Sequence, residues 1–207
     1  MGLRKATEGG LRRVAPREYA RDLEGLCLQL QDPDPTVRRW AVRDLGHVAQ
    51  VAPTLCEHLH HETDHAVREM IFTTLRREGS PEVAAGLMPL LRSEDANLRN
   101  SAIEVLSSMP QAMGPHVERL LDDPDADVRI FTLNVLNELR HPDVMRWVSG
   151  ALQRDPHVNV VAAALEVAAE SGTTAALPFI EQARQRFPDD AFIGFAADMA
   201  QQRIEAS

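Results

Sequence analysis

The sequence predicts an all-α protein: a right-handed α-α superhelix of about five helical hairpins with a C-terminal cap helix. Three observations support this prediction. A short motif recurs along the chain, its apolar positions repeat with the spacing of one helix face, and acidic or Asp-Pro-rich segments precede its copies. A hairpin of about 30 residues cannot cover its own apolar face, so hairpins of this length must stack to form a shared core.

The motif is clearest as DPDPTVRRWAVRDLG from Asp32 and as DPDADVRIFTLNVLNEL from Asp123, with shorter copies from Thr63 and Glu94. Each copy contains one arginine at the same place, and these arginines follow one another at intervals of 30, 31 and 30 residues. The regular interval means that the repeats have almost the same length. The four arginines are Arg38, Arg68, Arg99 and Arg129.

We term the residue before each motif arginine the aligned position. Apolar side chains lie at the aligned position and at four, five and eight residues past the aligned position. This spacing places them on one face of an α-helix, and a strand cannot produce it. A fifth copy follows after a longer interval. The aligned positions are Val37, Val67, Leu98, Val128 and Val160.

Acidic and proline-rich clusters such as 32–35 predict where these helices begin, because Asp caps a helix and Pro is tolerated in its first turn. Further amphipathic segments lie between the clusters, so each repeat is predicted to be two helices joined by a short turn. We expect the first helices at about 18–30, 52–61, 81–92, 111–121, 142–153 and 174–186.

One repeat domain is predicted over residues 17–207, after a flexible N-terminal arm at residues 1–16 that contains two adjacent glycines. The segment from Asp189 departs from the motif and is predicted to cap the open end of the stack. The predicted repeats are 18–50, 51–79, 80–110, 111–141 and 142–172, with the cap at 173–207.

The charge of the chain disfavours nucleic acid as a partner. The net charge is −9, and residues 78–207 hold 10 basic and 20 acidic side chains, whereas phosphate binding relies on a basic surface. No apolar run reaches the roughly 18 residues of a membrane span. Two cysteines, Cys27 and Cys56, do not form a disulfide framework. We therefore expect a cytoplasmic, bacterial protein, whose oligomeric state the sequence leaves open.

The repeated residues quoted above resemble HEAT repeats, in particular the short HEAT-like repeats first named from phycobilisome lyases. The resemblance extends over about residues 18–188. It implies a helical superhelix. Because the family consists mostly of scaffolds and binding platforms, it also implies a non-catalytic scaffold or adaptor that binds a peptide, a helix or a protein domain on its concave face.

Three enzyme classes with HEAT-like repeats are alternatives. The di-iron deoxyhypusine hydroxylases have His-Glu dipeptides on their inner helices, and none follows the motif arginines here. The DNA glycosylases of this type need a basic groove, which the acidic C-terminal half disfavours. A tetrapyrrole-handling protein similar to the bilin lyases stays open as an alternative function, although no residues specify a chromophore site. No catalytic residue and no cofactor is predicted.

An aspartate stands four residues before each motif arginine, as in Asp34 before Arg38. Such columns can form a stripe that binds phosphate or carboxylate groups. They can also form charge-assisted hydrogen bonds that join neighbouring repeats at their turns, and we favour this second interpretation because a stacking contact needs a copy in every repeat. The aspartates are Asp34, Asp64, Asp95 and Asp125.

The second helices are expected to line the concave side, with the side chains three, six, seven and ten residues past the aligned position facing outward. Apolar groups at these positions indicate a partner-binding surface, and arginines near the N-terminus would orient the partner. Alternatively, these side chains pack between adjacent second helices. The predicted contact residues are Trp40, Met70, Val105, Phe131, Val135, Arg39 and Arg43.

The segment CEHLHHETDH, from Cys56 to His65, is the one dense histidine cluster of the sequence. Histidines four residues apart on a helix can bind zinc or another transition metal. A polar helix end that meets water explains the same pattern, and no second cluster supplies a further ligand. Metal binding is therefore a third candidate function, with His58, His60, His61 and His65 as the candidate ligands.

Overall fold

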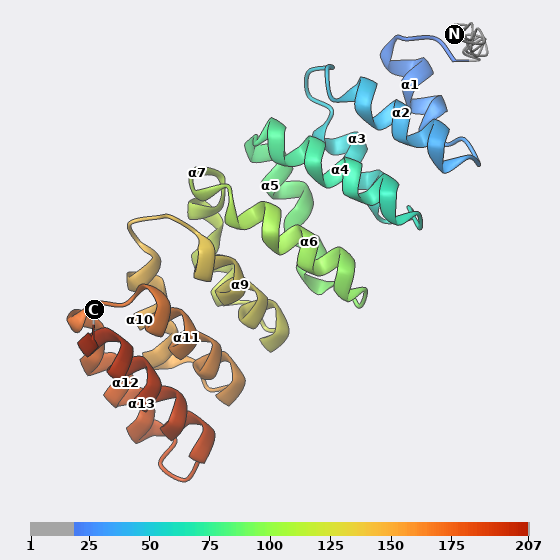
Figure 1. Ribbon diagram of the computed structural model, residues 1–207. Helices are drawn as coiled ribbons and strands as arrows, with labels where there is room; N and C mark the ends of the chain where they lie inside the picture. Colours follow the sequence, from blue (N-terminus) through green and yellow to red (C-terminus); the bar gives the residue numbers. More distant parts are fainter. Residues whose placement is uncertain (1–18, 207) are drawn as a thin grey trace, which may run out of the picture.

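The computed structural model describes residues 19–206, so the predicted arm at 1–16 lies outside the described residues. Within 19–206 the regular structure is entirely helical. Hairpins follow one another along an elongated stack, with α1 and α13 at its opposite ends (Figure 1). This arrangement confirms the predicted all-α solenoid. None of the helices in 19–206 is both long enough and apolar enough to cross a membrane.

The helices form two adjacent rows. The second helices of the hairpins are α2 (Pro35–Leu45), α4 (His65–Glu78), α6 (Ala96–Ser107), α9 (Ala126–Glu138), α11 (Val158–Ser171) and α13 (Ala191–Ala206), and each packs against the next. The first helices are α1 (Leu23–Gln29), α3 (Ala52–Leu59), α5 (Pro81–Leu87) with the 3-10 turn η1 (Met88–Arg92), α7 (Pro110–Met113) with η2 (Gly114–His116) and α8 (Val117–Leu121), α10 (Val144–Arg154), and η3 (Thr174–Ala176) with α12 (Leu177–Arg186).

Two of the first helices are broken where the sequence contains proline. Pro89 lies in η1 and Pro115 in η2, and each break is a short 3-10 segment. Proline has no backbone N–H to donate and its ring crowds the preceding turn, so the α-helix cannot continue through it.

The predicted helix starts are confirmed at the second helices. Asp34, Asp64, Asp95 and Asp125 are N-cap residues, and each side chain accepts a hydrogen bond from a backbone N–H of the first turn. In the fifth repeat His157 holds this position without a side-chain cap.

The apolar columns predicted from the motif form the core. Ala41, Val42 and Leu45 of α2 are fully buried, and the corresponding residues of α4, α6, α9 and α11 are buried or nearly so. One contiguous cluster of buried side chains runs from Leu26 to Ile204, as expected when each hairpin covers the next.

The segment predicted as a cap is itself a hairpin, because α13 packs against both α12 and α11. Asp190 caps α13 and stands three residues before the buried Ile193. The other capping aspartates also stand three residues before their aligned positions. Ile193 is therefore the aligned position of α13. Five and eight residues further on, where α2 has the buried Val42 and Leu45, α13 has the exposed Asp198 and Gln201. These polar side chains close the open edge of the stack.

Three of the four motif arginines bond to a carboxylate of the next repeat, as the favoured interpretation predicts, whereas Arg99 makes no such bond within 19–206 and instead lies over the Phe131 ring of the next repeat. Arg38 contacts Glu62, Arg68 contacts Asp95 at 2.7 Å, and Arg129 contacts Asp155. Each guanidinium also donates to a backbone carbonyl at the turn before its helix. The fifth repeat has Val161 in place of the arginine, and Arg186 of α12 donates instead to the carbonyls of Leu152 and Asp155.

Candidate protein-interaction face

The candidate site is the second-helix face, which we define as the side of α2, α4, α6, α9, α11 and α13 turned away from the first-helix row. A residue advances about 100° around an α-helix per position, so the residues two and six past the aligned position lie opposite the buried columns. Arg39 and Arg43 hold these positions on α2 and are exposed. Both residues therefore lie on this face, where the sequence placed them.

The predicted contacts at Val105 and Val135 are wrong. Both side chains are fully buried, with no exposed surface. They stand seven residues past the aligned position, and seven residues are almost two full turns, which returns the side chain to the core side of the helix. The sixth position, not the seventh, faces outward.

The residues three past the aligned position pack between adjacent second helices. Met70 and Phe131 are half-buried against the core, and the Arg99 guanidinium of α6 lies 4.3 Å above the Phe131 ring centroid. Trp40 holds the same position on α2 and is 40% exposed. Within 19–206 α2 is the first of the second helices, so Trp40 has no preceding second helix there of the kind that α6 provides for Phe131.

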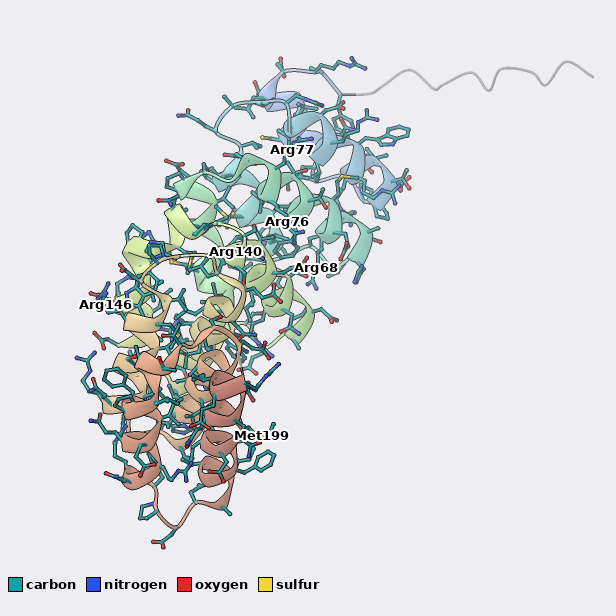
Figure 2. All side chains as sticks on the ribbon, turned by 60° about the vertical axis from the view of Figure 1, so that its left-hand side comes forward. Arg68, Arg76, Arg77, Arg140, Arg146 and Met199 are labelled. Carbon is teal, nitrogen blue, oxygen red and sulfur yellow. The ribbon has the colours of Figure 1, made fainter. Side chains whose placement is uncertain are left out.

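Three exposed apolar residues that the sequence did not reveal lie on α13. Phe192, Phe195 and Met199 are 58%, 62% and 40% exposed. With Ile193 as the aligned residue, Phe195 and Met199 hold the outward positions two and six. Figure 2 shows Met199 on the last helix, toward the opposite end of the stack from Arg76 and Arg77 of α4. Aligning Asp190 with the other capping aspartates would have revealed this register.

Charge on the second-helix face changes from one end to the other. Toward the N-terminus the outward side chains include Arg39, Arg43 and Arg76, of which Arg43 pairs with Asp44 and Arg76 with Glu104. Toward the C-terminus α9 and α11 contain a single basic residue, Arg129, which is buried and paired with Asp155. The exposed charges on these two helices are all acidic: Asp127, Glu138, Glu166 and Glu170.

Within residues 19–206 the side chains of the histidine cluster do not all come together. His58 is buried and its Nε2 lies 2.9 Å from Glu62 Oε2, while His60, His61 and His65 are exposed. Across residues 19–206 no three His, Cys, Asp or Glu side chains come together as metal ligands. The helix α3 ends at Leu59, so His60, His61 and His65 do not continue the helical spacing on which the prediction depended.

A hollow of about 960 Å³ lies on the first-helix side, between α8, α10 and α12. Several of its charged groups are in ion pairs, such as Arg146 with Glu118 at 2.6 Å and Arg129 with Asp155 at 2.7 Å. No histidine or cysteine is among the described residues that line it.

The stacked hairpins and their arginine contacts define an α-helical repeat protein. A model of HEAT repeats matches residues 23–107 and 115–193, which together make up most of the chain. The chain belongs to the HEAT-repeat family.

Two crystal structures of engineered proteins, both from the Northeast Structural Genomics Consortium, are similar to this chain. The first has 19% sequence identity and a TM-score of 0.44, and the match covers 90% of this chain and 99% of the other. The second has 20% identity and a TM-score of 0.40, with coverage of 88% and 96%. A search of curated proteins found no match.

Proposed function

We propose that this chain is a non-catalytic scaffold or adaptor that binds a protein partner on its second-helix face. The observation that carries the proposal is the exposure of Phe195 and Met199 at outward positions that are polar on α2, α4 and α6. Exposed apolar residues that lie together on one face are typical of interaction sites. Arg39 and Arg43, exposed at the other end of the same face, would orient a long partner through their charge.

A further repeat stacked on α13 would not cover Phe195 and Met199. The edge of α13 on which a further hairpin would stack has the polar Asp198 and Gln201, and Asp198 pairs with Arg184 of α12. Phe195 and Met199 lie on a different side of the helix, which the stack itself does not use. An interaction with another protein explains why apolar side chains are kept there.

Site-specific photo-crosslinking tests the proposal. A photoreactive phenylalanine analogue replaces Phe195 in the full chain, and a matched control carries it at Gln185, an exposed residue of α12 in the other row. In cells of the native host we expect a defined protein adduct from position 195 and none from position 185. The adduct should disappear when Met199→Ser is added to the crosslinking chain. Adducts from position 185 alone, or from neither position, would contradict the proposal.

A stability control separates loss of binding from loss of the fold. Phe195→Ser and Met199→Ser remove exposed groups, so the free energy of unfolding should change by less than about 0.5 kcal/mol. Val135→Ser places a hydroxyl in a fully buried site and should cost about 2–4 kcal/mol. A binding defect in the α13 variants then reports on the face itself.

A further inference from the structure

We infer that the α9–α11–α13 part of the second-helix face binds a cationic amphipathic helix of a partner protein. This inference rests on the proposed function and specifies the chemistry of the partner. The inference is drawn from an exposed apolar stripe on α13, small side chains on the adjoining helix, and exposed charges on α9 and α11 that are all acidic.

The apolar stripe has the length and spacing that a short helix recognises. Phe192, Phe195 and Met199 follow one another at intervals of three and four residues, so they line one side of α13. From the first to the last they span about 10 Å along the helix axis, or two helical turns. An amphipathic helix places its own apolar side chains with this same repeat, which is how helices dock on apolar faces.

The adjoining helices have no charged side chain two residues past the aligned position. On α11 the residues two and three past the aligned position are Ala162 and Ala163, whose short side chains are almost fully buried. On α9 the same positions hold Ile130 and Phe131, both half-buried against the core. In α2, α4 and α6 the residue two past the aligned position is always polar, as Arg39 is on α2. This position therefore changes from polar to apolar across the last three repeats, and the exposed apolar side chains themselves lie on α13.

The charges around this surface select a cationic partner. Asp127, Glu138 and Glu166 are exposed and make no ion pair with another residue of 19–206. Glu170 is paired with Arg203 of α13, which is the basic residue closest in sequence to the apolar stripe. Lysine or arginine side chains on the polar side of a docked helix would face the unpaired carboxylates, which favours basic partners and speeds their association.

Peptide binding to the full chain provides the test. The probe is a fluorescein-labelled amphipathic helix of leucine and lysine, and two further probes are a scrambled peptide of the same composition and a leucine–glutamate helix. Fluorescence anisotropy should give a dissociation constant on the order of 10 μM for the first probe, because the surface is small. The scrambled peptide should bind about tenfold more weakly, and the acidic helix should not bind measurably.

Variants of the chain assign the binding to this face. Phe195→Ser with Met199→Ser should weaken binding of the cationic helix about tenfold. Glu138→Gln with Glu166→Gln should weaken it a few-fold and reduce its dependence on salt. The matched control is Leu23→Ser with Leu28→Ser on α1, where two apolar residues are 50% and 59% exposed at the other end of the stack. These changes should leave the affinity unaltered.

Three results would overturn the inference: equal affinity for the scrambled peptide, unchanged affinity in the α13 variant, or self-association of the chain that Phe195→Ser abolishes. The last result, measured by sedimentation, would give this face to a second copy of the chain. If the peptides fail to bind while photo-crosslinking at position 195 still yields a partner, the scaffold function stands and only the inferred partner chemistry is wrong.

Discussion

Arg38 of α2 and Glu62, at the turn after α3, form a buried ion pair with two parallel hydrogen bonds. Arg38 Nε lies 2.7 Å from Glu62 Oε2, and Nη2 lies 2.7 Å from Oε1. The Glu62 carboxylate also accepts from the backbone N–H of Asp64 and lies within hydrogen-bond distance of His58. A single carboxylate thus connects the first repeat with both helices of the second.

Removing this carboxylate should strongly destabilise the N-terminal repeats. Glu62→Ala leaves the Arg38 guanidinium buried without its partner, which we expect to cost about 3–5 kcal/mol in the free energy of unfolding. Urea denaturation followed by circular dichroism measures it. The control is Glu118→Ala, which breaks the exposed pair with Arg146 and should cost far less, because water screens an exposed pair. Equal losses in the two variants would show that burial of the pair does not matter.

The same carboxylate predicts how stability depends on pH. Although burial acts to raise the pKa of Glu62, hydrogen bonds from Arg38, Asp64 and His58 lower it from 4.5 to about 2. The unfolded chain therefore binds this proton more readily than the folded chain. The stabilisation is complete above pH 4.5 and is lost as the pH falls toward 2.

Comparison with Glu62→Gln isolates this contribution from that of the other carboxylates. The difference in unfolding free energy between the two proteins should be greatest above pH 5 and should shrink between about pH 4.5 and pH 2. Urea titrations at several pH values provide the measurement. A difference that stays constant over this range would mean that the Glu62 pKa is not lowered in the folded state.

Arg186 should hold the last hairpin in place. It donates to the backbone carbonyls of Leu152 and Asp155 in a repeat that has no motif arginine of its own. We expect Arg186→Ala to accelerate amide hydrogen exchange in α12 and α13 by about tenfold while α2–α6 stay unaffected, since the loss is local. The control is Arg154→Ala, an exposed residue of α10. Uniform acceleration along the whole chain would indicate global unfolding instead.

The two cysteines should differ in their reactivity. Burial raises the pKa of the Cys56 thiol to about 12, so very little of it is thiolate near neutral pH. Cys27 is only half-buried. Iodoacetamide at pH 8 should therefore label Cys27 in the folded chain and Cys56 only after denaturation. Mass spectrometry of the digested protein distinguishes the two sites, and equally fast labelling of both would disprove the expectation.

Much of the fold was predictable because it depends on local patterns. The aspartates that cap α2, α4, α6 and α9 and the apolar columns behind them act within one or two turns of helix, so their spacing along the chain is sufficient. The contacts of Arg38 and Arg129 with the next repeat were also predictable in kind, because the motif recurs. Their partners, Glu62 and Asp155, lie outside the aligned aspartate column, so the pattern could not name them.

The candidate site was less predictable, because exposure depends on what lies next to a helix. Trp40 and Phe131 occupy the same column, yet Phe131 lies against Arg99 of α6, whereas no second helix precedes α2 within the described residues. Val135 was assigned to the wrong side of its helix by a small angular error. Phe195 and Met199 were overlooked because the register of α13 is set by the capping Asp190, in a segment that departs from the motif.

The sequence by itself determined the class of fold, the length of the repeat, the helix starts and the main apolar columns of the core, because short-range helical periodicity and capping encode all of these. Only the tertiary structure decided which outward side chains meet solvent, how the fifth repeat is tied to the sixth, and where an apolar face stays uncovered. Those properties depend on contacts between segments far apart in the chain, which no local pattern specifies.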